Sequence, residues 1–90
     1  MNTFEKQSVA VISTAHLTPE TANMLNEGSM NPTTAPTPTR YGWLVITNIV
    51  DKATPPDLQK LLDWARKQGC LYLMLDCDAD TVDALPQYDW

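Results

Sequence analysis

Apolar residues along the chain gather into three short runs that are separated by two segments with helical patterning. The runs lie at the centres of "SVAVIST" (8–14), "RYGWLVITN" (40–48) and "CLYLMLD" (70–76). Short continuous apolar runs bounded by polar residues are typical of strands that are covered on both faces. We therefore expect three strands, one in each of these stretches.

The segment "LTPETANMLNEG" (17–28) carries start and stop signals for a short first helix. Thr18 is an N-cap residue, and Pro19 suits the first helical position, where a missing amide hydrogen costs nothing. Gly28 is the expected terminator, because glycine adopts the left-handed conformation that ends many helices.

The segment "TPPDLQKLLDWARKQG" (54–69) predicts a second, longer helix that begins at the N-cap Thr54 and ends at Gly69. Four apolar residues recur at the i, i+3, i+4 and i+7 spacing of one helix face, namely Leu58, Leu61, Leu62 and Ala65. We expect this face to pack on a sheet.

The resulting order, β-α-β-α-β, predicts a small α/β domain with right-handed crossovers and a three-stranded, mainly parallel sheet. Two helices can cover both faces of such a sheet if the first strand lies in the middle, so we favour the strand order 2-1-3. The alternative order 1-2-3 places both helices on one face. The other face would then be bare and would require a partner or a homodimer.

A chain of 90 residues predicts a single domain over 1–90. Residues 29–39 contain three prolines and four threonines, a composition that favours a flexible loop. Much of the net charge of -5 lies in an acidic C-terminal segment, 76–90, which has no Lys or Arg. Five aspartates carry it: Asp76, Asp78, Asp80, Asp83 and Asp89.

This composition argues against several classes of function. Nucleic-acid binding relies on clustered Lys and Arg, which the chain lacks, and a glycine-rich phosphate loop cannot be built from three scattered glycines. No apolar run approaches the roughly 18 residues of a membrane span, and no signal peptide is apparent. Cys70 and Cys77 lack the C-x-x-C spacing, so we expect reduced thiols in a cytoplasmic protein.

The motif Asp76-x-Asp78-x-Asp80 resembles the opening of a calcium-binding loop, because alternate carboxylates can converge on one cation. The resemblance fails further on, where Thr81 replaces the glycine at position six and Gln87 replaces the glutamate at position twelve. A Mg²⁺ or Ca²⁺ site therefore remains an alternative, and otherwise we expect no cofactor.

The simpler interpretation of the same motif is a strand end followed by a capped turn. Asp80 would cap a short helical turn over 81–85, Asp83 would support its N-terminus, and Asp76 and Asp78 would be solvated. A third possibility is that these carboxylates contact a basic partner surface.

The sole histidine, His16, is interpreted as a loop residue near a helix start. Acid-base chemistry would require a hydrogen-bonding partner that the sequence does not identify. Ser13 and Thr14 lie beside it, but no G-x-S-x-G motif is present. Tyr88 and Trp90 lie in the terminal "LPQYDW", which we expect to fold back so that the acidic tail frames a surface.

Three stretches resemble a known family. The opening "VISTAHLTPET", then "YGWLV" and the ending "LLDWARKQGCLYLMLDCDADTVDALPQYDW" are similar to bacterial domain-of-unknown-function family 5983. The resemblance implies a small accessory protein of plasmids, prophages and genomic islands, and it brings no catalytic residues. It also suggests one surface shared by the two end motifs, with Ser13, Thr14, His16, Asp76, Asp78 and Asp80 as its members.

Two hypotheses of function follow. We favour a non-catalytic protein-interaction module that binds a host or defence-system protein through an acidic edge, formed by Asp76, Asp78, Asp80, Asp83, Tyr88, Trp90 and His16. The alternative is a small metal-dependent enzyme or ligand-binding domain in which His16 acts with Asp76, Asp78 and Asp80.

Overall fold

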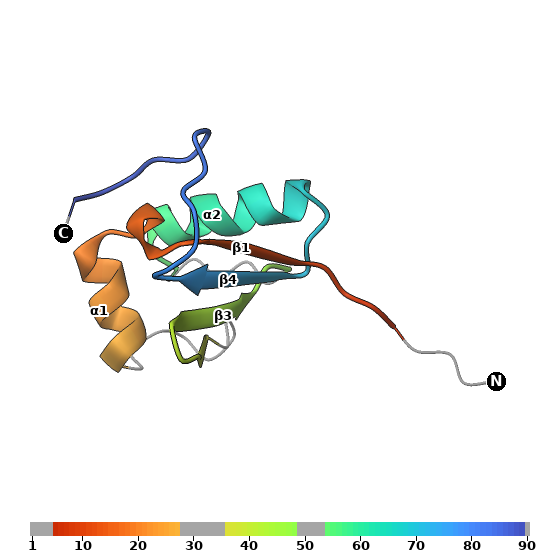
Figure 1. Cartoon of the computed structure of the whole chain (residues 1–90), viewed down its shortest axis with the longest axis horizontal. Helices are drawn as coiled ribbons and strands as arrows, with labels where there is room; N and C mark the ends of the chain where they lie inside the picture. The colour runs from red at the N-terminus through yellow and green to blue at the C-terminus, as the bar shows by residue number, and fades with distance from the viewer. Residues whose placement is uncertain (1–4, 28–35, 49–53, 90) are drawn as a thin grey trace.

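Within the described residues, four strands form one mixed sheet in the order β1-β4-β3-β2 (Figure 1). The strands are β1 (Val9–Ser13), β2 (Thr37–Pro38), β3 (Gly42–Ile46) and β4 (Tyr72–Asp76). Between them lie a short 3-10 helix, η1 (Thr14–His16), and the helices α1 (Pro19–Glu27) and α2 (Pro56–Lys67). The computed structural model describes residues 5–27, 36–48 and 54–89.

The predicted three-stranded, mainly parallel sheet of order 2-1-3 is wrong. β4, and not β1, lies between the other two long strands, and β1 forms a margin of the sheet. β1 and β4 are parallel, but β3 is antiparallel to both β4 and β2. Each of the three predicted strands is nevertheless found where its apolar run lies.

A hairpin explains the unexpected direction of β3. β2 runs parallel to β1 and β4, which is the direction expected after a helical crossover. The chain then reverses in a tight turn, closed by a 2.8 Å hydrogen bond from the amide of Thr39 to the carbonyl of Gly42. β2 is taken from the segment that the sequence assigns to the Pro/Thr-rich loop, and residues 29–35 of that segment lie outside the described residues.

The start of α1 follows the sequence prediction, and the start of α2 does not. The hydroxyl of Thr18 accepts a 3.3 Å hydrogen bond from the amide of Thr21, as an N-cap does. In α2 the N-cap is Pro55 instead of the predicted Thr54, and Pro55 has no side-chain group that could cap the helix. Thr54 lies buried beside it.

The end of α2 is a glycine-terminated motif, as predicted. Gly69 has a φ of 80°, and its amide donates to the carbonyl of Arg66 at 2.9 Å. The amide of Cys70 donates to the carbonyl of Ala65 at 3.0 Å, which completes the pair of bonds typical of a Schellman motif. The predicted terminator of α1, Gly28, lies outside the described residues.

One hydrophobic core joins both helices to one face of the sheet. The strand register aligns Ile12, Leu75 and Trp43 on this face, and these side chains form one buried cluster with the helices. The helical members of the cluster are Ala22 and Leu25 of α1 and Leu58, Leu61, Leu62 and Ala65 of α2. The predicted apolar face of α2 is therefore confirmed. None of the helices in the described ranges could cross a membrane.

Candidate functional site

The imidazole of His16 is buried, with 1% of the residue exposed. Its Nδ1 lies 2.7 Å from the carbonyl oxygen of Pro86, and its Nε2 lies 2.9 Å from the amide nitrogen of Val82. A carbonyl can only accept and an amide can only donate, so the hydrogen is assigned to Nδ1 and the ring is neutral. Both ring nitrogens are therefore occupied, and neither is available for a metal ion or a substrate proton.

His16 thus holds the segment that follows β4 against the end of β1. Two backbone hydrogen bonds act alongside it, from Tyr88 to the carbonyl of Ala15 at 2.9 Å and from Ser13 to the carbonyl of Asp80 at 3.2 Å. The expectation that the C-terminal segment folds back on its own domain is met for the described residues. Tyr88 is half-buried there, and Trp90 lies outside the described residues.

The acidic motif forms a turn that depends on its own aspartate. A carboxylate oxygen of Asp76 accepts a 2.8 Å hydrogen bond from the amide of Asp78, and the carbonyl of Asp76 accepts from Ala79 at 3.1 Å. Asp78, Asp80 and Asp83 are exposed, and Asp76 is half-buried. The strand ends in a turn, but Asp76 and not Asp80 supports it, and these residues form a negatively charged loop at one end of the sheet.

The predicted helical turn over 81–85 is not formed. The chain makes a single reverse turn instead, closed by a 3.0 Å hydrogen bond from the amide of Leu85 to the carbonyl of Val82. Asp80 therefore caps no helix and contributes its carbonyl to Ser13. His16 binds the backbone on both sides of this turn, at Val82 and at Pro86.

Oxygen and sulfur atoms of Asp76, Cys77 and Asp78 lie within 4.8 Å of one another, a grouping that could hold a cation. Within the described part of the chain, Asp80 and His16 do not belong to it. The alternate aspartates suggested Asp76, Asp78 and Asp80 as ligands. In the structure the exposed thiol of Cys77 takes the place of Asp80 in this grouping. A Mg²⁺ or Ca²⁺ site remains a hypothesis.

The two end motifs meet, as the resemblance suggests. Because β1 and β4 are parallel neighbours, Ser13 pairs with Asp76 at the same end of the sheet. A small hollow of about 230 Å³ opens beside this pair, lined by Ser13, Thr14, Ala15, Cys77 and Tyr88.

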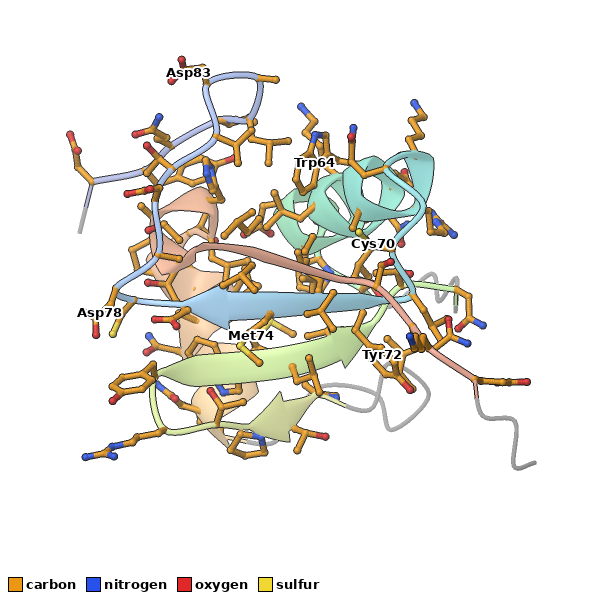
Figure 2. The ribbon with its side chains drawn as sticks, turned by 45° about the vertical axis from the view of Figure 1, so that its right-hand side comes forward. Trp64, Cys70, Tyr72, Met74, Asp78 and Asp83 are labelled. Carbon is orange, nitrogen blue, oxygen red and sulfur yellow. The ribbon has the colours of Figure 1, made fainter. Side chains whose placement is uncertain are left out.

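The face of the sheet opposite the helices is open and apolar. Its side chains alternate with the core residues along the three long strands and comprise Val9, Val11, Leu44, Ile46, Tyr72 and Met74. Val9 is 43% exposed and Val11 52% exposed. Figure 2 shows Tyr72 and Met74 on this face, with no described helix in front of them. We call these six residues the open face.

Asp76 continues the open face into the acidic turn, since it follows Tyr72 and Met74 at alternate positions of β4. Sequence reasoning missed the open face because all three runs read as strands buried on both sides. The alternative strand order 1-2-3, in which both helices lie on one face of the sheet, would have predicted an open face.

The chain matches the model of a family of unknown function, the C-terminal domain of DUF5983, over residues 9–90. It belongs to this family. The resemblance noted from the sequence is therefore confirmed, and the match to the DUF5983 C-terminal domain begins at Val9, the first residue of β1. Neither a curated protein nor a solved structure matches the chain.

Proposed function

We propose that this domain is a non-catalytic protein-interaction module that binds its partner through the open face and the adjoining acidic turn. The observation that carries the proposal is the exposure of Val9 and Val11 beside four further apolar side chains. A contiguous apolar surface with a polar, here acidic, rim at one end is typical of a protein-binding site.

The charge of the turn indicates the chemistry of the partner. Asp76, Asp78 and Asp80 lie at one end of the open face, and the chain carries a net charge of -5. A complementary partner presents an apolar patch flanked by Lys or Arg, so that attraction between the charges orients the complex. A bacterial host or defence-system protein is the class of partner that we propose.

The size of the face argues against a second copy packed on it face to face. Three strands of five residues span about 14 Å by 17 Å, or about 240 Å² in projection. A stable complex buries about 800 Å² on each partner. A partner that also covers the acidic turn comes closer to that size than a symmetric dimer of the open face alone.

His16 supports the binding surface from within instead of performing chemistry. Its two backbone hydrogen bonds hold the segment that carries Asp80 and Asp83. This explains the place of the histidine in the family motif without assigning it a substrate.

Site-specific photo-crosslinking in bacterial cells tests the proposal. A benzophenone amino acid placed at Val11 or Met74 should give one discrete protein adduct, whereas the same group at Glu20, exposed on α1, should not. Asp78→Asn together with Asp80→Asn should weaken the adduct from Val11. Equal labelling from Val11 and Glu20, or no adduct from either face position, would show that the open face is not the contact surface.

A further inference from the structure

A groove of about 840 Å³ runs between α2 and the turn that follows the acidic loop. One wall is the exposed side of α2, and the other is the segment 83–86. Figure 2 shows Trp64 on the side of α2 that faces the loop carrying Asp83. The apolar lining comes from Pro56, Trp64, Ala84, Leu85 and Pro86.

The far wall of this groove is fixed before any ligand arrives. Val82, which precedes the wall, and Pro86, its last residue, are both hydrogen-bonded to the ring of His16. Leu85 is buried and anchors the wall in the core. Binding in a groove whose walls are already ordered avoids the entropy cost of forming it.

The charges along the groove differ from those of the remaining surface. Lys60 and Lys67, two of six basic residues in the chain, line it and form no salt bridge with another described residue. The carboxylate of Asp63 is already engaged, because it accepts from Gln59 at 3.1 Å and pairs with Arg66. Of the two carboxylates that line the groove, only that of Asp83 is free to pair with the two lysines among the described residues.

The spacing of these groups defines a ligand. Lys60 and Lys67 are two helical turns apart on α2, which is about 10 Å along the axis. In a polyproline II segment, which has three residues per turn, side chains three residues apart lie on the same side and are about 9 Å apart. The ring of Trp64 lies between the two lysines in sequence and offers an aromatic surface for an apolar side chain or a proline.

We infer that this groove binds a polyproline II segment of a partner protein in which two acidic residues, spaced three apart, enclose apolar residues. The acids pair with Lys60 and Lys67, and the residues between them pack on Trp64. The site is separate from the open face, and unlike the acidic turn it presents two lysines. It does not depend on the proposed function, and either can fail without the other.

Nuclear magnetic resonance titration of the ¹⁵N-labelled 90-residue chain tests the inference. The probe is the capped peptide Gly-Glu-Leu-Pro-Glu-Gly, and its control replaces both glutamates by glutamine. The glutamate peptide should shift the indole signal of Trp64 and the amides of 60–67 and 83–85 in a saturable manner. Lys60→Gln with Lys67→Gln should weaken binding about five-fold, the combined effect of two exposed ion pairs.

Lys6→Gln, which removes one lysine outside the groove, is the matched control and should leave the affinity unchanged. Three results would overturn the inference. They are no saturable shift at millimolar peptide, equal binding of the glutamine peptide, and shifts centred on the open face. Full affinity in the double lysine variant would also contradict it.

Discussion

A carboxylate oxygen of Asp57 accepts a 2.7 Å hydrogen bond from the hydroxyl of Thr21, and so joins the first turn of α2 to the first turn of α1. The other carboxylate oxygen accepts from the amide of Thr18 at 2.9 Å and from its hydroxyl at 3.2 Å. Asp57 therefore caps the neighbouring helix and not its own.

Asp57→Ala should lower the free energy of unfolding by about 2 to 3 kcal/mol, because three hydrogen bonds to a charged acceptor are lost and the amide of Thr18 loses its partner. Urea denaturation measures the change. Asp63→Ala, in the same helix, removes a surface ion pair and should cost under about 1 kcal/mol. A double-mutant cycle with Thr21→Val that gave purely additive effects would contradict a direct contact.

His16→Ala should destabilise the domain by about 2 to 4 kcal/mol, since it leaves a buried cavity and removes the partners of Val82 and Pro86. Hydrogen exchange should become faster at the amides of Val82 and Tyr88 than at those of α2. Asn23→Ala, on an exposed position of α1, is the control. Unchanged exchange at Val82 would mean that the histidine does not hold this segment.

Gly42→Ala and Gly69→Ala should differ in severity. A Cβ atom at Gly42 would lie 1.8 Å from the backbone oxygen of Leu75, so β3 and β4 would have to separate, and we expect a loss above about 3 kcal/mol or no folding. At Gly69 the space is open and the cost is the positive φ of 80°, about 1 to 2 kcal/mol. Thermal unfolding followed by circular dichroism would rank the two variants, and the reverse order would contradict the pairing of β3 with β4.

Addition of millimolar Mg²⁺ or Ca²⁺ should leave the melting temperature unchanged within about 1 °C, because Asp76 already closes its turn through the amide of Asp78. A saturable increase that disappears in Asp78→Asn would instead establish a cation site at Asp76, Cys77 and Asp78. Glu20→Gln provides the charge-matched control.

Local signals in the sequence located most elements but could not determine the direction of every strand. The periodic leucines of α2 and the Thr18-Pro19 pair act within one or two turns of helix, so the sequence reveals them directly. The pairing of Thr37–Pro38 with Trp43 and Leu44 has no comparable signal. A two-residue edge strand that contains proline resembles a loop, and its turn lacks the Asn-Gly pair that marks many hairpins.

The candidate site was harder to predict for the same reason. The ring of His16 is hydrogen-bonded to Val82 and Pro86, which lie 66 and 70 positions further along the chain. Its burial therefore depends on how the whole chain folds. Asp76 and Asp78 were expected to be solvated from their surroundings alone. Asp78 is exposed, whereas Asp76 is half-buried and closes its own turn. The open face followed from strand order, which short apolar runs do not determine.

The pairing of β1 with β4 also has a consequence for how the protein is made. Among the described strands, β1 has β4 as its sole neighbour, and β4 is the last of them to leave the ribosome. Contacts between distant parts of a chain form slowly, because a long loop must close first. During synthesis the apolar β1 therefore has an unpaired edge until β4 has been made. Premature termination before Asp76 should leave an aggregation-prone fragment instead of a smaller folded domain.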